Sequence, residues 1–290
     1  MTDKDAANTA PDNADPKPGE NPEYPVPLGP QMATLLLEEA YEPSDIEDIE
    51  DIVKRSLTED APLKFVDSGA PHVAAFTLGG EYFAATCVDK PYPVQDGGVS
   101  PADLAHPVFF GADPQERAEL HDARAHLLIA HRPDMDAPSE IPAREQKFKQ
   151  RALHALVTAM ISQLPGTLGV FFPSVKTTLS PRHLQEFTMS ESPFPSAYMA
   201  PTWLKPEEDG SVSGYTIGLM DLGHPELQVT KSKGDPQKIF ELLADTAAHV
   251  VGGATIIGGQ TVGRTDDDKH ATSFAPWIID GDKKAIEVEM

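Results

Sequence analysis

The sequence contains a single cysteine, Cys87. One cysteine excludes an intramolecular disulfide and any zinc site built from several cysteine ligands. Cys87 lies within an apolar segment of strand character, where a thiol usually packs as a small hydrophobic side chain. Nothing else in the sequence supports a cysteine–histidine nucleophile pair.

Long apolar runs are also missing. No uninterrupted stretch approaches the roughly 20 apolar residues that a membrane-spanning helix needs. The first residues, Met-Thr-Asp-Lys-Asp-Ala-Ala-Asn, lack the apolar segment of a secretory signal. We therefore expect a cytoplasmic protein that does not bind membranes.

Basic residues are scarce, since 23 Lys and Arg face 46 Asp and Glu and give a net charge of −23. Residues 1–30 hold only six of the acids and two of the bases, so about −19 remains on the rest of the chain. Such a field repels nucleic-acid phosphates and anionic lipids, and we expect neither partner. It would suit a basic protein partner. The alternative, which carries more weight, is that an acidic surface keeps the protein soluble.

Familiar catalytic patterns are absent as well. The glycine-rich run 252–263 does not fit a phosphate-binding loop, because it follows a helix and has Gly259-Gln260 where Lys-Ser/Thr is required. The chain has no His-Glu-x-x-His helix and no Gly-x-Ser-x-Gly turn. The sequence predicts no catalytic residue and no cofactor.

Two groups of potential metal ligands have simpler explanations. The acidic run 266–268 with His270 could ligate a hard cation, but it lacks the EF-hand spacing and is better interpreted as a solvated loop. His121, His126 and His131 lie five residues apart, so on a strand they alternate between faces and cannot converge on one ion. We predict no metal site.

Residues 1–30 contain seven prolines and no apolar periodicity, which is typical of a disordered tail. The rest, 31–290, is predicted to form one α+β domain: mixed or antiparallel sheets packed by a few amphipathic helices. A division into two β-α-β-rich halves, 31–135 and 136–290, is a further option. No internal repeat supports that division.

The centre of the predicted core is a helix and strand over Ile141–Pro173. Apolar side chains recur at helical spacing from Phe148 to Leu164, and Pro165-Gly166 ends the helix. The opposite face is predicted to be solvated. It carries the polar residues Arg144, Glu145, Lys147, Lys149, Gln150 and Arg151.

Other elements follow from periodicity and from helix-start and turn signals. The opening order is β-α-β-β-β, with a helix start at Ser44-Asp-Ile-Glu47 and a hairpin turn at Gly79-Gly80. Strands are predicted at 32–37, 63–67, 72–78, 81–88, 123–130, 167–173, 202–205, 211–219, 227–231, 255–262 and 285–288. Further helices are predicted to begin at Pro114, Pro181 and Pro236.

The most distinctive local pattern is 214–228, where a strand runs into Gly223-His-Pro, turns and leaves as another strand. Gly218 indicates a bulge or a close approach of another backbone. A tightly packed structural turn is the favoured interpretation. If the turn instead bounds a ligand site, the candidate binding residues are Trp203, Tyr215, Thr216, His224, Glu226, Thr261 and Arg264.

The pattern Gly218-Leu-x-x-Leu-Gly-x-Pro-Glu-Leu227 resembles that of DUF4261, a bacterial family of domains of unknown function. The segment Gly259-Gln-Thr-Val-Gly263, the strand 125–130 and the long helix fit the same family's order. The resemblance spans roughly 31–290. It implies a fold, and it brings no activity or catalytic residues.

Two hypotheses of function follow, with a third in reserve. The first is a non-enzymatic cytoplasmic bacterial protein that binds another protein, as an adaptor or by neutralising a toxin. The second is an enzyme or small-ligand binder with its site near the 214–228 turn, which requires the candidate side chains to converge. A purely structural or assembly role would require an oligomer, and no coiled-coil heptads indicate one. The sequence leaves the oligomeric state open.

Overall fold

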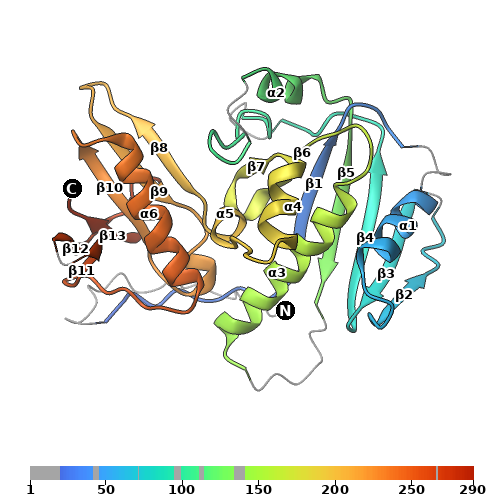
Figure 1. Cartoon of the computed structure of the whole chain (residues 1–290), viewed down its shortest axis with the longest axis horizontal. Helices are drawn as coiled ribbons and strands as arrows, with labels where there is room; N and C mark the ends of the chain where they lie inside the picture. The colour runs from blue at the N-terminus through green and yellow to red at the C-terminus, as the bar shows by residue number, and fades with distance from the viewer. Residues whose placement is uncertain are drawn as a thin grey trace, which may run out of the picture.

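The computed structural model describes residues 20–41, 46–70, 72–94, 99–110, 114–133, 141–265 and 267–290. Figure 1 shows two lobes side by side, each built on one β-sheet. The first lobe holds a seven-stranded sheet of order β2-β3-β4-β5-β1-β6-β7, and the second a six-stranded sheet of order β11-β12-β13-β10-β9-β8. Helices pack on both sheets, which confirms the predicted α+β class.

The bounds of the elements are as follows. The first lobe comprises β1 (Gln31–Leu37), α1 (Ile46–Ser56), β2 (Leu63–Val66), β3 (Val73–Leu78), β4 (Glu81–Val88), α2 (Pro114–Glu119), η2 (Leu120–Asp122), β5 (Ala125–Arg132), α3 (Ala143–Ile161), β6 (Thr167–Phe172), η3 (Pro173–Val175), β7 (Thr177–Leu179) and α4 (Pro181–Met189). The second comprises α5 (Ser196–Met199), β8 (Thr202–Pro206), β9 (Val212–Thr216), η4 (Met220–Leu222), β10 (Glu226–Ser232), α6 (Pro236–Val251), β11 (Thr261–Thr265), β12 (Asp268–Pro276) and β13 (Lys284–Val288).

The first sheet is antiparallel and covered on both faces. Leu35 and Leu37 of β1 point into the main core beneath α1, α3 and α4, whereas Leu36 points into a smaller cluster with Phe110 and Leu120 on the other face. Burial of both faces explains why β1 ends in three consecutive leucines, 35–37, without polar alternation. The predicted opening order β-α-β-β-β is confirmed, and Gly79 and Gly80 take the positive φ values, +63° and +93°, of a tight hairpin turn.

Aromatic rings pair across neighbouring strands on the helix-covered face. Phe65, Phe76, Phe83 and His131 lie directly opposite one another on β2, β3, β4 and β5. Their successive ring centroids are 5.8, 5.4 and 4.3 Å apart, and His154 of α3 stacks on His131 at 5.8 Å. Such cross-strand pairs fix the register of the sheet and seat α3 on it.

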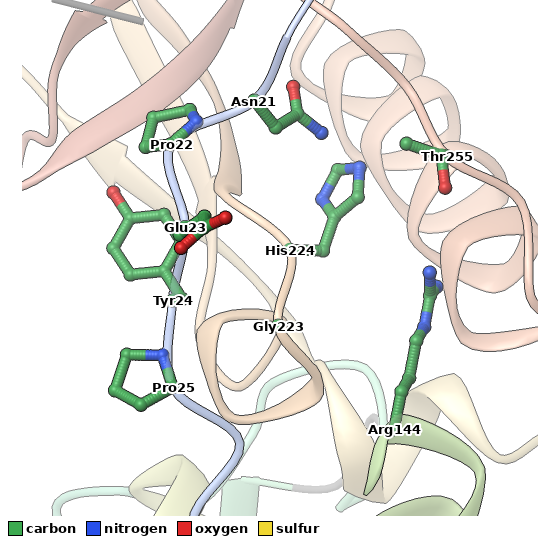
Figure 2. Close-up of a pocket in the computed structure, with 9 residues that line it drawn as sticks. All are labelled: Asn21, Pro22, Glu23, Tyr24, Pro25, Arg144, Gly223, His224 and Thr255. Carbon is green, nitrogen blue, oxygen red and sulfur yellow. The ribbon is translucent and has the colours of Figure 1, made fainter. Parts of the chain in front are cut away.

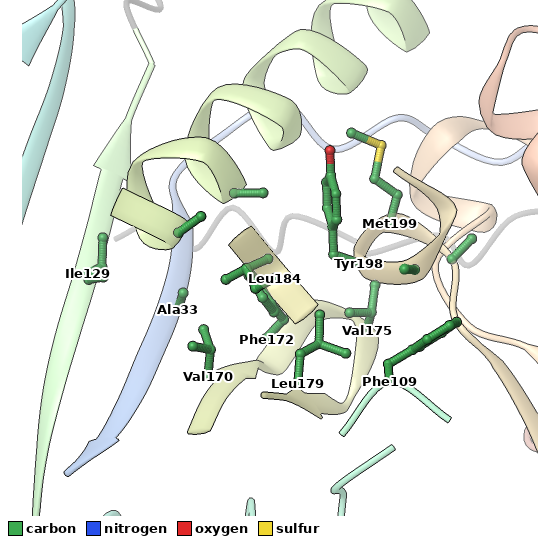
Figure 3. Close-up of a cluster of buried hydrophobic side chains, with 14 of the residues drawn as sticks. Ala33, Phe109, Ile129, Val170, Phe172, Val175, Leu179, Leu184, Tyr198 and Met199 are labelled. Carbon is green, nitrogen blue, oxygen red and sulfur yellow. The ribbon is translucent and has the colours of Figure 1, made fainter. Parts of the chain in front are cut away.

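One hydrophobic cluster extends through both lobes. It joins Leu35 of the first sheet to Ile286 of the second through buried residues of α3, α5 and α6. Figure 3 shows its central part, where Leu184 of α4 and Val175 lie near Tyr198 and Met199 of α5. Along the chain, the last strand of the first sheet ends at Leu179 and the first strand of the second sheet begins at Thr202. This boundary lies well after residue 135, where the sequence suggested a division into halves.

The second sheet is mostly antiparallel, with β10 and β13 as its one parallel pair among the described strands. Helix α6 lies across it. Asp235 caps this helix by accepting a hydrogen bond from the Gln237 N–H at 3.0 Å. None of the described helices is both long enough and apolar enough to cross a membrane.

One strand prediction in the second lobe is wrong, and one strand there was not predicted. The strand expected at 255–262 begins only at Thr261, because residues 254–260 form an irregular segment whose Gly258 packs under the ring of Phe274. Strand β12 was missed, since its acidic start at Asp268 has the composition of a loop and only Thr272 along it is buried. Pairing with β11 and β13 makes it a strand.

The N-terminal segment 20–30, which we call the strap, runs in an extended course along both lobes. The Tyr24 hydroxyl donates to the Lys284 carbonyl at 2.6 Å and accepts from the Lys284 N–H at 3.1 Å. The Lys147 ammonium donates to the Pro27 carbonyl at 2.6 Å. These contacts hold residues 20–30 on the fold, whereas the sequence predicted disorder for 1–30. Residues 1–19 and the predicted helix start at Ser44 lie outside the described residues.

We predict that Tyr24→Phe lowers the free energy of unfolding by about 1–2 kcal/mol, because it removes both hydrogen bonds of the hydroxyl. The measurement is chemical denaturation. Tyr92→Phe is the matched control, because the contacts found for Tyr92 are ring contacts with His126 and Phe171. Equal stability of wild type and Tyr24→Phe would show that the strap does not stabilise the fold.

Candidate functional site

The 214–228 segment forms the turn between β9 and β10, with η4 in its middle. Gly218 has φ +122°, and a Cβ atom at this position would lie only 2.1 Å from the carbonyl oxygen of Met199. Only glycine permits both the backbone angle and this approach. The predicted close approach of another backbone is therefore confirmed, and the backbone is that of α5.

Glu226 caps this turn from inside the protein. Its side chain is buried and accepts hydrogen bonds from the Thr216 hydroxyl at 2.7 Å and from the backbone N–H groups of Gly218 at 2.7 Å and Met220 at 3.1 Å. Burial raises the pKa of Glu226, and these hydrogen bonds oppose the rise. The carboxylate and the Thr216 hydroxyl thus serve the turn and do not face an open cavity.

Arg151 of α3 holds the same turn from the other lobe. Its guanidinium donates to the carbonyls of Met199 at 3.1 Å and Gly218 at 3.4 Å, and it forms an ion pair with Asp221 at 2.5 Å. The side chain is only 5% exposed, so its charge depends on these partners.

The prediction that the polar face of the long helix is solvated is therefore wrong in part. Lys147, Gln150 and Arg151 are buried, because the second lobe and the strap cover this end of α3. A polar stripe at helical spacing runs along this face: Lys147, Arg151, His154 and Thr158. In the sequence, this spacing was the feature that could have predicted a second buried face of α3. Burial lowers the pKa of Lys147 to about 8.

His224 is buried with both ring nitrogens bonded. Nε2 accepts the backbone N–H of Ile256 at 3.1 Å, and Nδ1 lies 2.7 Å from the Pro225 carbonyl, which assigns the proton of the neutral ring to Nδ1. Burial lowers the pKa of His224 to about 4. The imidazole therefore anchors residues 255–256 beside the turn as a neutral ring.

A cavity of about 670 Å³ opens beside His224. Figure 2 shows it between the strap at Asn21–Pro25, the turn at Gly223 and His224, Arg144 of α3 and Thr255. Arg144 donates to the carbonyls of Val250 and Ala254 and so caps the end of α6. The cavity is large enough for a small molecule.

Thr261 and Arg264 line a different depression, between β11 and α6, with a volume of about 420 Å³. The Arg264 guanidinium bridges to Asp245 at 2.5 Å and to Glu241 at 3.1 Å. These two acidic partners raise the pKa of Arg264.

Trp203 and Tyr215 lie opposite each other on β8 and β9, away from both the cavity at His224 and the depression beside α6. Trp203 packs on the ring of His106, with ring centroids 4.6 Å apart, at the junction of the lobes. His106 Nε2 lies 2.7 Å from the Thr202 carbonyl, which links the first lobe to β8.

The seven candidate residues thus divide among an internal turn, the cavity at His224, the depression beside α6 and the lobe junction. Glu226 does not line the cavity that His224 lines, and neither residue meets Thr261 or Arg264. Among the residues that the structure describes, no three His, Cys, Asp or Glu side chains are grouped as metal ligands would be.

Comparison with known families supports the resemblance over the C-terminal part of the chain. The family described as "Domain of unknown function (DUF4261)" matches residues 215–289, which run from Tyr215 through the turn, α6 and the last four strands. The matched segment contains Glu226 and the depression beside α6, whereas Arg151 and the strap lie outside it. No curated protein and no solved structure matches the chain.

We predict that Gly218→Ala lowers the free energy of unfolding by about 3 kcal/mol or more, because the new Cβ meets the Met199 carbonyl. The matched control is Gly210→Ala, where φ is also positive, +81°, but no atom lies within 4 Å of the new Cβ. The control should lose about 1 kcal/mol from backbone strain alone. Similar losses in both variants, measured by chemical denaturation, would contradict the close approach.

His224 should make stability depend on pH. Its pKa is lowered from 6.5 in the unfolded chain to about 4 in the fold, so the unfolded state binds more protons between these values. The stability associated with neutral His224 is present above pH 6.5 and is lost as the pH falls toward 4. The difference in unfolding free energy between wild type and His224→Gln should therefore shrink by about 3 kcal/mol on acidification. A constant difference across this pH range would contradict the assignment.

Proposed function

We propose that the protein is a non-enzymatic protein of the bacterial cytoplasm that acts by binding a partner with a basic surface. The carrying observation is the charge balance. Only 23 Lys and Arg accompany 46 Asp and Glu, so half of the carboxylates lack a Lys or Arg counter-charge anywhere in the chain. A surface with this surplus attracts a basic partner and speeds its association.

The distribution of acidic side chains supports this proposal. Exposed carboxylates gather on α1 and its flanking loops, at Glu38, Glu39, Glu47, Asp48, Asp51, Glu59 and Asp60. Two surface cations form ion pairs within their own helix, Lys54 with Glu50 and Lys149 with Glu145. Such exposed pairs contribute little to stability, so the fold does not depend on this acidic surface.

The chemistry of the 214–228 turn also favours binding over catalysis. Its most distinctive side chains, Glu226, Thr216 and His224, are held by hydrogen bonds within the fold. A general acid or base must reach the proton that it transfers. An adaptor or toxin-neutralising protein needs no such group.

A second candidate function is small-ligand binding beside the same turn. The observation that favours it is the cavity of about 670 Å³ at His224, which has Arg144 and Glu23 on its wall. A carboxylate-bearing metabolite would complement Arg144. This candidate requires ligand-dependent stabilisation that is lost in Arg144→Ala.

The test of the proposed function is capture of partners by the tagged full chain from its native host's lysate, followed by reconstitution with the purified candidate. We expect one dominant basic protein that forms a stoichiometric complex, with an affinity that falls as salt concentration rises. Polyglutamate at equal charge concentration is the control, since it should compete weakly against a specific complex. Only weak, unselective binding that polyglutamate abolishes would favour the solubility explanation.

A further inference from the structure

The depression beside α6 has the form of a groove along a strand. One wall is α6, at Leu242, Asp245, Thr246 and His249, and the other is β11, at residues 261–264; Ala254 and Ile256 also line it. Strand and helix lie side by side, since Arg264 meets Glu241 and Asp245 in the middle of the helix. We call this depression the α6–β11 groove.

The groove follows an unpaired edge of the sheet. In the strand order of the second sheet, β11 is terminal and, among the strands that the structure describes, pairs with β12 alone. Four consecutive residues, 261–264, line the groove. The pairing of β11 with β12 shifts register between Val262 and Thr265, and the hollow takes in all four residues across this irregularity, so it runs along the strand and not over one face of it. An edge of this kind offers backbone N–H and C=O groups to another strand.

The floor of the groove is apolar. Leu242 and Ile256 are buried there, and Val262 is half-buried. A volume of about 420 Å³ accommodates the alternate side chains of a short extended segment. An aliphatic side chain would remove this floor from water.

The rim of the groove is acidic at the Arg264 end. Glu241 and Asp245 share the one guanidinium of Arg264, so one negative charge remains there. Both carboxylates are accessible, with exposed fractions of 38% and 46%. His249 stands at the other end, with Nδ1 bonded to the Asp245 carbonyl at 2.9 Å. A Lys or Arg side chain of a bound segment would neutralise the negative charge that remains at Glu241 and Asp245.

We propose that the α6–β11 groove binds an extended segment of a basic protein as an added strand on β11. Alternate aliphatic side chains of that segment enter the floor at Leu242, Ile256 and Val262, and a Lys or Arg side chain reaches Glu241 and Asp245. The proposal rests on the proposed function and deepens it, because it names the site and the chemistry of the partner.

The test uses the full chain and a fluorescent peptide of alternating lysine and valine. We expect it to bind with an affinity that falls about tenfold in Asp245→Lys and in Glu241→Lys. Glu145→Lys is the matched control, because Glu145 is an exposed helical acid beside a cation, Lys149, on α3, and its replacement changes the net charge equally. It should change the affinity less than about twofold. Equal weakening in all three variants would mean attraction to the general acidic field and would overturn the proposal.

Addition of the peptide as a strand on β11 can be tested separately from its charge. N-methylation of alternate backbone amides in the peptide blocks one hydrogen-bonding edge and should abolish binding, and a glutamate–valine peptide should not bind. Amide resonances of residues 261–265 should shift when the lysine–valine peptide is added. Unchanged binding of the N-methylated peptide, or shifts confined to other residues, would overturn the proposal.

Two other occupants would also overturn it. A second copy of the chain in the groove would give a concentration-dependent dimer that Asp245→Lys dissociates. Occupation by residues 1–19 would make the peptide bind only after their removal. The proposed function fails separately: a salt-sensitive complex with the host partner that is unaffected by Asp245→Lys would keep the function and reject the groove.

Discussion

The fold depends on one buried cation at the meeting of its two lobes. Arg151 projects from α3 of the first lobe and binds the carbonyls of Met199 and Gly218 together with the carboxylate of Asp221. A guanidinium in this position costs several kcal/mol to desolvate, so it persists only because the second lobe offers it two carbonyls and a carboxylate as acceptors. Its position also requires the Gly218 backbone to approach α5 closely.

The same turn is held by opposite charges from two sides. The Gly218 N–H donates to the Glu226 carboxylate while the Gly218 carbonyl accepts from Arg151, so one residue lies between an anion and a cation. This arrangement explains the glycine–proline–glutamate pattern of 218–227 in physical terms. Its residues shape and cap a turn that fixes the second sheet against α3, which is a structural use of side chains that would elsewhere indicate catalysis.

Outside this junction, most charged side chains lie at the surface of the protein. The interior uses few ionised groups, each with defined partners, whereas the surface carries a large surplus of carboxylates. The surplus is general, whereas the α6–β11 groove, the proposed binding site, combines acidic side chains with a terminal strand and an apolar floor. A general acidic field attracts basic proteins; a groove of this kind selects among them.

The sequence by itself determined the elements whose signals are local. Periodicity placed α3 and α6, proline and aspartate marked where helices begin, and Gly79-Gly80 marked a hairpin, because these signals act within a few residues. The sequence also indicated a bulge or a close backbone approach at Gly218, and the structure shows the close approach. They failed where partners are distant: β12 becomes a strand only between β11 and β13, and 254–260 remains irregular because Gly258 lies under Phe274.

Only the tertiary structure decided which polar residues are buried and which candidate residues meet. Lys147 and Arg151 have the composition of a solvated helix face, yet the strap and the second lobe cover them, and no local pattern encodes contacts with residues more than fifty positions away. For the same reason Trp203, His224, Glu226 and Arg264, which all fall in the last third of the chain, lie in separate places. The fold arranges strands in the order β11-β12-β13-β10-β9-β8, and that order, set by long-range pairing, separates what the sequence places together.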